Sequence, residues 1–450
     1  MALCTSIGAL ALPSELIVHI FSFLSDREKL RASAVCSRWR ECLFYPALWT
    51  ELKLRVGGGT NGGGSGSEQT PRLEFLMRKF GSFVRELRLE FAPVEGYLSP
   101  LNGGTESVES DPQFAERWKD AMVTYLDQVL CVLGGLRYNR IQLLFEEILS
   151  NSRQMKWLSS AFMLGVVTPR SLASLSNAST SSLEHLSLLD NQLPSLVSTV
   201  ELERLVHLRS LSLDFCDFTS DMCRLLASAD RAPLHRLSLL LNGTALDVKP
   251  LDGMTTEEDW KALVRCSTNL RVYIMAMDVC SQDLLRVLKP SIPLERIHLD
   301  SYSTLVTDGV VELISQQYHK TLTHFILMRD DAGFPDLSVN RNEDPLVLLT
   351  WRCVHLAVLI IHGYTVWSHN LVAISRLRGS NLKVLEVSEE SIDFDPDQSV
   401  YIEGDPVHNL VKEVSLGLDR AWRPSIDNSI VLNEPTQHFH REMQSFSAGM

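Results

Sequence analysis

The strongest constraint on the fold of this chain is a short apolar pattern, L-x-x-L-x-L, that recurs along most of its length. The pattern begins at Val84, Leu183, Leu208, Leu234, Leu270, Leu294, Leu322, Leu356 and Leu382, with weaker matches at Met155 and Val411. Successive starts from Leu183 onward are 24 to 36 residues apart, and 72 of the 450 residues are leucine. Regular spacing of this kind is typical of solenoids built from stacked repeats.

Helix signals lie between the recurring strands. The stretch 255–258, Thr-Thr-Glu-Glu, has the pattern of a capping box, and Asp344-Pro345 places a cap before a first-turn proline. The stretch 368–378 precedes Gly379, a typical helix-ending residue. A strand followed by a helix, repeated, predicts an α/β solenoid like that of leucine-rich repeats, with a parallel sheet and helices on its outside. An ordinary α/β domain with leucine-rich strands is the alternative.

Composition divides the chain into four parts. Residues 8–56 form a compact apolar segment, and residues 57–71 are rich in Gly and Ser, which predicts a flexible linker or loop. The solenoid pattern occupies residues 72–418, where a polar stretch at 99–113 is expected to be a disordered insertion. Residues 419–450 lack a clear period, and we expect them to form a tail.

The N-terminal segment has the pattern of amphipathic helices. Apolar side chains recur at helical spacing at Leu12, Leu16, Ile20 and Leu24, and again at Val35, Cys36 and Trp39. Such spacing places each set on one helix face. About 45 residues are too few to bury all of these groups among themselves, so some of them should contact a partner.

The same segment resembles the F-box. Its sequence LPSELIVHIFSFLSDREKLRASAVCSRWRECLFYPALW contains the Leu-Pro-x-Glu start, the helix ending in Leu, the Val-Cys-x-x-Trp motif and the terminal Leu-Trp of that family. The matching positions are Leu12, Pro13, Glu15, Leu16, Ile20, Leu24, Leu30, Val35, Cys36, Trp39, Pro46, Leu48 and Trp49. Ser25 and Lys29 depart from the family, in which Pro and Asp are common. The resemblance implies a small all-α domain ahead of the solenoid.

The resemblance also implies a function. F-box proteins dock the adaptor subunit of an SCF-type cullin–RING ubiquitin ligase, and they present a protein substrate for ubiquitination and degradation. By this resemblance, the adaptor-binding residues are Leu12, Pro13, Leu16, Ile20, Leu24, Val35, Cys36 and Trp39. The chain would meet the cullin and RING subunits through the adaptor, would hold an unidentified protein substrate, and would not itself be an enzyme.

The repeats would supply the substrate-binding face. In each L-x-x-L-x-L strand the third, fifth and seventh residues point away from the core. We predict substrate binding at Arg296, His298, Asp300, His324, Ile326 and Ile360, because aliphatic side chains ringed by polar groups are typical of interfaces. The same rule places Val272, Ile274 and Ala276 on this face. The alternative is that a loop or the tail covers several of these side chains.

No motif for catalysis or for cofactor binding stands out. The G-x-G-x-x-G match at 57–62 lies in low-complexity sequence without a following helix. The nine cysteines and thirteen histidines show no metal-ligand spacing. Cys36 has no histidine nearby in sequence, which favours a packing role over nucleophilic catalysis. We therefore expect no cofactor, no metal and no enzymatic activity.

Charge and hydropathy limit the partners. With 55 acidic and 42 basic side chains, the formal net charge of −13 argues against direct nucleic-acid binding. No apolar run reaches the roughly 18 residues of a membrane span, and the apolar N-terminus lacks the basic start of a signal peptide. We expect no membrane partner and a location in the cytoplasm, the nucleus or both.

Three functions are compatible with these features. The first is a substrate receptor of a ubiquitin ligase, and the second is an adaptor-bound scaffold without a role in ubiquitination. The third is a horseshoe-type interaction or inhibitor protein whose N-terminal helices only cap the first repeat. Adaptor binding separates the third from the others, and stabilisation of a partner on cullin inhibition separates the first from the second.

Overall fold

The computed structural model describes the chain in segments, which fall into two compact units. The described residues are 12–24, 26–56, 83, 85–91, 136–161, 171–189, 199–243, 246, 254–301, 304–329, 333–338, 344–394, 405–425 and 435–449. The first unit is Met1–Glu95 with Val132–Glu184, and the second is Gly96–Cys131 with His185–Met450. The predicted linker 57–71 and the predicted insertion 99–113 lie outside the described residues.

The first unit begins with short helices and continues into parallel strands. Its helices are α1 Ser14–Ser22, α2 Asp26–Ala32, α3 Ser37–Cys42, α6 Leu136–Asn151 and α7 Asn177–Ser182, with 3-10 turns η2 Pro46–Leu48 and η5 Leu172–Ser174. Its strands are β1 Glu51–Val56, β2 Glu86–Phe91 and β3 Trp157–Ala161. β1 pairs parallel with β2, and β2 pairs parallel with β3.

The second unit is built on one parallel sheet. Its strands are β4 His185–Leu189, β5 Ser210–Asp214, β6 Arg236–Asn242, β7 Arg271–Met277, β8 Leu294–Ser301, β9 His324–Arg329, β10 Val358–His362 and β12 Val384–Val387. They pair in this order, each parallel to the next. Two short strands, β11 Val366–Trp367 and β13 Ile392–Asp393, form a separate parallel pair.

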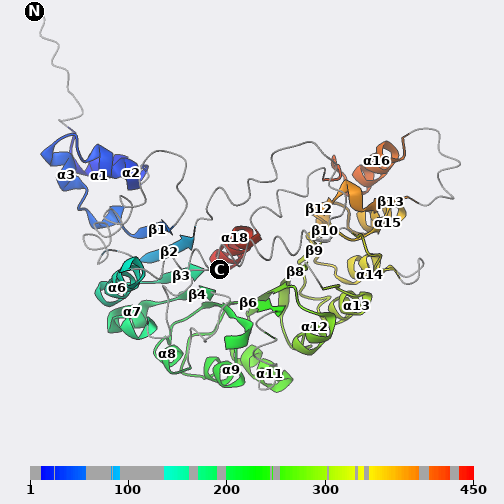
Figure 1. Cartoon of the computed structure of the whole chain (residues 1–450), viewed down its shortest axis with the longest axis horizontal. Coiled ribbons are helices and arrows are strands. Elements are labelled where there is room, and N and C mark those ends of the chain that lie inside the picture. The colour runs from blue at the N-terminus through cyan, green and yellow to red at the C-terminus, as the bar shows by residue number, and fades with distance from the viewer. Residues whose placement is uncertain are drawn as a thin grey trace, which may run out of the picture. The chain divides into compact units, whose positions relative to one another are not determined.

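Helices alternate with these strands. They are α8 Thr199–Glu203, α9 Ser220–Leu226, α11 Glu257–Cys266, α12 Ser281–Val287, α13 Asp308–Gln317, α14 Pro345–Arg352, α15 Ser368–Arg378, α16 Pro406–Leu418 and α18 Pro435–Ala448, with 3-10 turns η6 Phe215–Asp217, η7 Gly379–Asn381 and η8 Glu389–Ser391. Figure 1 shows α9, α11, α12 and α13 along one side of the sheet and α18 on the other. We call the side that bears α18 the inner face. The predicted fold class, a small all-α segment followed by a repeat-like α/β solenoid, is confirmed.

The leucines of the recurring pattern form the core between sheet and helices. The second and third leucines of the motif align across strands, as in the pairs Leu186 with Leu211 and Leu211 with Leu237. Each of these side chains is fully buried. A single strand–helix repeat could not bury such an apolar face alone, so the stacking of neighbouring repeats stabilises the solenoid.

The predicted helix signals lie at helix ends, with the capping box displaced by one residue from the predicted stretch 255–258. Thr256 caps α11 in a capping box whose third-position partner is Asp259, and the Asp344 carboxylate accepts hydrogen bonds from the backbone N–H groups of Leu346 at 2.8 Å and Val347 at 3.0 Å. α15 ends at Gly379, whose φ of +53° is a conformation that glycine favours.

Two expectations were wrong. The weak strand match at Val411 lies in the helix α16, because Asp405 caps it, Pro406 takes its first turn and the buried Leu410, Val414 and Leu418 recur every four residues. The second error concerns β7. Ser238 pairs with Tyr273, so Arg271, Tyr273 and Met275 share the inner face, and Val272, Ile274 and Ala276 point to the core.

Candidate functional site

The N-terminal helices share a small core. Ile17 and Phe21, one turn apart on α1, are fully buried together with Trp49. The indole Nε1 of Trp49 donates a 2.6 Å hydrogen bond to the carbonyl oxygen of Leu43. Leu12, Leu24, Leu30 and Trp39 pack partly buried against this core. The core side of α1 is therefore occupied from within the F-box.

Another side of α1 carries large apolar side chains in water. Leu16, Ile20 and Phe23 are 49%, 41% and 76% exposed. Their spacing of four and then three residues aligns them in one row on the helix, which we call the α1 stripe. Exposed apolar groups next to a complete core are typical of a docking surface. Phe23 was not predicted, although its i+7 spacing from Leu16 is a signal that could have found it.

The other predicted adaptor residues have different positions. Trp39 lies 5.6 Å from Phe21, ring centroid to centroid, in an edge-on contact. The Cys36 sulfur accepts a hydrogen bond from the backbone N–H of Trp39 at 3.5 Å and so caps α3. Pro13 and Val35 are exposed. Adaptor contact by any of the eight predicted residues stays a prediction.

Lys29, one of the two departures from the family pattern, has a structural role. Its side chain is buried, its ammonium donates a 3.2 Å hydrogen bond to the carbonyl oxygen of Leu48, and it lies 5.2 Å from the centre of the Trp49 ring. This cation–π contact and hydrogen bond satisfy a charge that burial would otherwise penalise. Ser25, the other departure, lies outside the described residues.

The six predicted substrate-binding residues come together on three adjacent strands. They are Arg296, His298 and Asp300 on β8, His324 and Ile326 on β9, and Ile360 on β10. Arg296 pairs with His324, and Ile326 lies between His298 and Ile360 in register, so all six share the inner face. This shared face agrees with the alternation of side chains along a strand.

The surface that these six residues offer is smaller than the sequence suggests. His298, Asp300 and Ile326 are buried, and the Arg296 side chain is 19% exposed. Burial, followed by the nearby cations Arg296 and Lys383, lowers the pKa of His324 to about 4. His324 is therefore neutral at physiological pH. Contact of these residues with a substrate stays a prediction.

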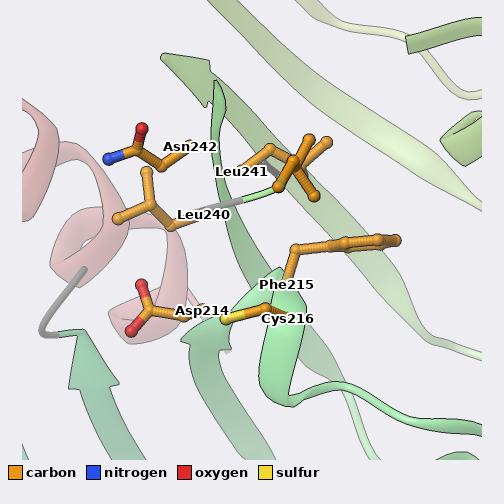
Figure 2. A pocket seen from close by; sticks show the side chains of 7 residues that line it. Asp214, Phe215, Cys216, Leu240, Leu241 and Asn242 are labelled. Atoms are coloured by element: carbon orange, nitrogen blue, oxygen red, sulfur yellow. The ribbon is translucent and has the colours of Figure 1, made fainter. Parts of the chain in front are cut away.

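A small pocket opens near the ends of β5 and β6. It is lined by Asp214, Phe215, Cys216, Leu240, Leu241, Asn242 and Leu246, whose side chains Figure 2 shows as sticks. It has room for about one water molecule. A pocket of this size does not fit an organic substrate.

Metal-ligand clusters, reactive thiols and membrane-spanning helices are the features of the described part of the chain that would support other functions. No cluster of three or more His, Cys, Asp or Glu side chains could hold a metal ion there. Burial raises the pKa of the Cys223 and Cys353 thiols to about 12, which keeps them in the unreactive protonated form. Among the same residues, no helix combines the length and the apolar character that crossing a membrane demands.

Comparison with known proteins assigns the class of protein. A family model described as F-box-like matches residues 9–55. F-box only protein 33 of Homo sapiens is 56% identical to this chain, over 99% of the chain and 89% of that protein. The chain therefore belongs to the F-box protein family. F-box only protein 33 of Mus musculus is 54% identical with the same coverage, and F-box/LRR-repeat protein 8 of Homo sapiens is 24% identical over 80% of the chain and 90% of that protein.

Proposed function

We propose that this chain is the substrate-recognition subunit of an SCF-type cullin–RING ubiquitin ligase. It would dock the adaptor through its F-box and hold a protein substrate with its solenoid for ubiquitination and degradation. The observation that carries the proposal is the α1 stripe, because Leu16, Ile20 and Phe23 stay exposed while the F-box core is complete without them. The F-box-like match over residues 9–55 supports the same role.

The α1 stripe suits a helix that inserts into an apolar groove. In that binding mode a few anchors at helical spacing contribute most of the free energy. Full burial of three such side chains contributes about 1.5 to 3 kcal/mol each. Because association costs roughly 4 to 15 kcal/mol, further F-box residues must add to the contact, and exposed Pro13 and Val35 are the predicted ones.

The substrate would bind the solenoid rather than react with it. The predicted residues share the inner face of the adjacent parallel strands β8, β9 and β10, where Arg296, His324 and Ile360 are only partly buried. The F-box-like match over residues 9–55 supports a non-catalytic chain, and burial keeps the thiols of Cys223 and Cys353 protonated. We further propose a location in the cytoplasm, the nucleus or both, supported by the odd number of scattered cysteines.

The test is co-purification of the adaptor with the full chain and with the double variant Leu16→Asp/Ile20→Asp. Two carboxylates placed in an apolar groove cost several kcal/mol, so we expect adaptor recovery to fall to background. The matched control is Leu285→Asp/Leu305→Asp, which changes two leucines of the solenoid that are 42% and 45% exposed and should keep adaptor binding.

Each outcome decides between the functions. If the control binds the adaptor and the F-box variant does not, docking through α1 stands. If wild type itself fails to bind, the N-terminal helices act only as a cap for the repeats, and the interaction or inhibitor function takes precedence. An adaptor-bound chain whose partners do not accumulate on cullin inhibition would be a scaffold.

A further inference from the structure

The inner face of the solenoid is occupied by a segment of the chain itself. The C-terminal helix α18 lies against this face (Figure 1). Arg236 on β6 donates hydrogen bonds to the carbonyl oxygens of Phe446 at 3.3 Å and Gly449 at 3.0 Å. The tail that showed no period in the sequence thus forms a helix that covers part of the predicted substrate-binding surface.

One aromatic side chain anchors this helix. Phe446 is 1% exposed, and the centre of its ring lies 5.2 Å from the guanidinium carbon of Arg236 and 5.1 Å from that of Arg296. The ring also meets Tyr273 edge-on at 5.7 Å between centroids. These two cation–π contacts and one aromatic pair form a site on the sheet that favours an aromatic ring.

A carboxylate accompanies the ring. Glu442, one turn before Phe446, lies 4.0 Å from the Arg296 guanidinium. On the sheet, the Glu295 carboxylate lies 3.5 Å from the guanidinium of Arg271 and 3.9 Å from that of Arg296, and it interacts electrostatically with Arg236. These three cations and one anion together carry a net positive charge. An acidic helix complements this surface. The groove therefore selects a helix with a carboxylate and an aromatic residue four positions apart.

The fit of α18 to this surface is incomplete. The hydroxyls of Ser210, Ser212 and Ser238, on the two strands that α18 contacts, are buried and have no hydrogen-bond partner among the described residues. The Ser447 hydroxyl of α18 is in the same condition. Buried hydroxyls without partners destabilise the arrangement that covers them. A helix that offered polar groups to these serines would bind better than α18 does.

We propose that the inner face over β5 to β8 is a docking groove for an amphipathic helix of a partner protein, with a Phe and an Asp or Glu four residues before it, and that α18 occupies this groove until the partner displaces it. This inference rests on the proposed function, since the partner would be the substrate. The partner helix would carry the same two groups as α18, an aromatic ring in the place of Phe446 and a carboxylate in the place of Glu442.

The test uses a fluorescent peptide with the sequence of residues 435–449 as the probe, and full-length protein. While α18 occupies the groove, the probe cannot bind there. The apparent affinity of the protein for the probe is therefore reduced in proportion to the fraction of molecules whose groove is open. We expect Phe446→Ala protein, whose α18 has lost its anchor, to bind the probe at least about tenfold more tightly than wild type does. Adding Arg236→Ala to this variant should abolish the gain.

Two peptide variants test the motif. A probe with Phe446→Ala and a probe with Glu442→Ala should each bind the opened protein at least about tenfold more weakly than the native probe. If both bind as tightly as the native probe, the groove does not read the ring and the carboxylate, and the proposal is overturned.

Further variants guard against misfolding. Glu442→Arg in the full chain keeps Phe446 but repels Arg296, so it should also increase probe binding, whereas Ser445→Ala, at an exposed position of the same helix, should not. Cooperative urea unfolding of each variant shows that its solenoid is folded, and adaptor binding tests the proposed function separately. Probe binding that neither Phe446→Ala nor Glu442→Arg increases would overturn the groove. A wild-type dimer that Phe446→Ala converts to a monomer would instead assign the groove to a second copy of this chain.

Discussion

At the residue scale, we expect His324 on the inner face to make the stability of the fold depend on pH. Burial, with Arg296 and Lys383 nearby, lowers its pKa from 6.5 to about 4. The folded state therefore binds fewer protons than the unfolded state between these values. The stability that neutral His324 contributes is present above pH 6.5 and is lost as the pH falls toward 4.

Replacement of this side chain should reduce acid sensitivity. The free energy of unfolding of wild type should fall between pH 7 and pH 5, and we expect this fall to be about 1 kcal/mol smaller in His324→Gln. The figure is reduced to allow for solvent screening, because the ring is partly exposed. Urea unfolding of wild type and variant at both pH values measures it. An equal loss in the two proteins would show that His324 does not titrate in this window.

The roles of single residues were harder to predict than their importance. Leu12, Leu16, Ile20 and Leu24 share one period in the sequence, yet Leu16 and Ile20 are exposed while Leu12 and Leu24 pack against the core. Leu12 and Leu24 lie outside α1 Ser14–Ser22, so the helical spacing does not place them on the same side as Leu16 and Ile20. The capping role of Cys36 was likewise not predicted, because sulfur is a weak acceptor and an uncommon cap.

At the element scale, the approach of α15 to α16 depends on one glycine. A Cβ atom on Gly417 would lie 2.2 Å from the Oγ atom and 2.8 Å from the Cβ atom of Ser375. We expect Gly417→Ala to lower the free energy of unfolding by about 1 to 3 kcal/mol through overpacking, as measured by urea unfolding. Ser375→Gly in the same protein should restore part of the loss, because it removes the clashing atoms.

A second glycine provides the control. Gly309 lies in α13, where the nearest atom to an added Cβ is the Thr307 Oγ1 at 3.9 Å. Gly309→Ala should be neutral or stabilise the protein by up to about 1 kcal/mol, through helix propensity alone. Equal effects at the two sites would contradict close helix packing at Gly417.

Elements were predictable where two signals coincided. The strands that begin near Leu183, Leu208 and Leu234 formed as predicted, because period and alternation agree there. β7 failed in its facing, since the run Arg271–Met277 is apolar on both sides and a shift of one residue exchanges the faces. The match at Val411 failed because capping and a four-residue period overrode a short apolar pattern.

At the scale of the whole molecule, the sequence predicted the F-box followed by a parallel α/β solenoid, and it left open whether a loop or the tail covers the predicted substrate-binding residues. The contact of Phe446 with Arg236 and Arg296 joins residues some 150 to 210 positions apart, where no local period can signal it. The proposed function requires both the F-box and the solenoid, because the F-box must connect a substrate on the solenoid to the ligase.

The most direct measurement of that claim is the amount of ubiquitin-conjugated protein that co-purifies with the chain from cells with an inhibited proteasome. Wild type and the Leu285→Asp/Leu305→Asp control should both recover conjugates. The Leu16→Asp/Ile20→Asp variant should recover the same partners without ubiquitin, because its solenoid is intact and its adaptor contact is lost. Equal amounts of conjugates with all three proteins would contradict the account.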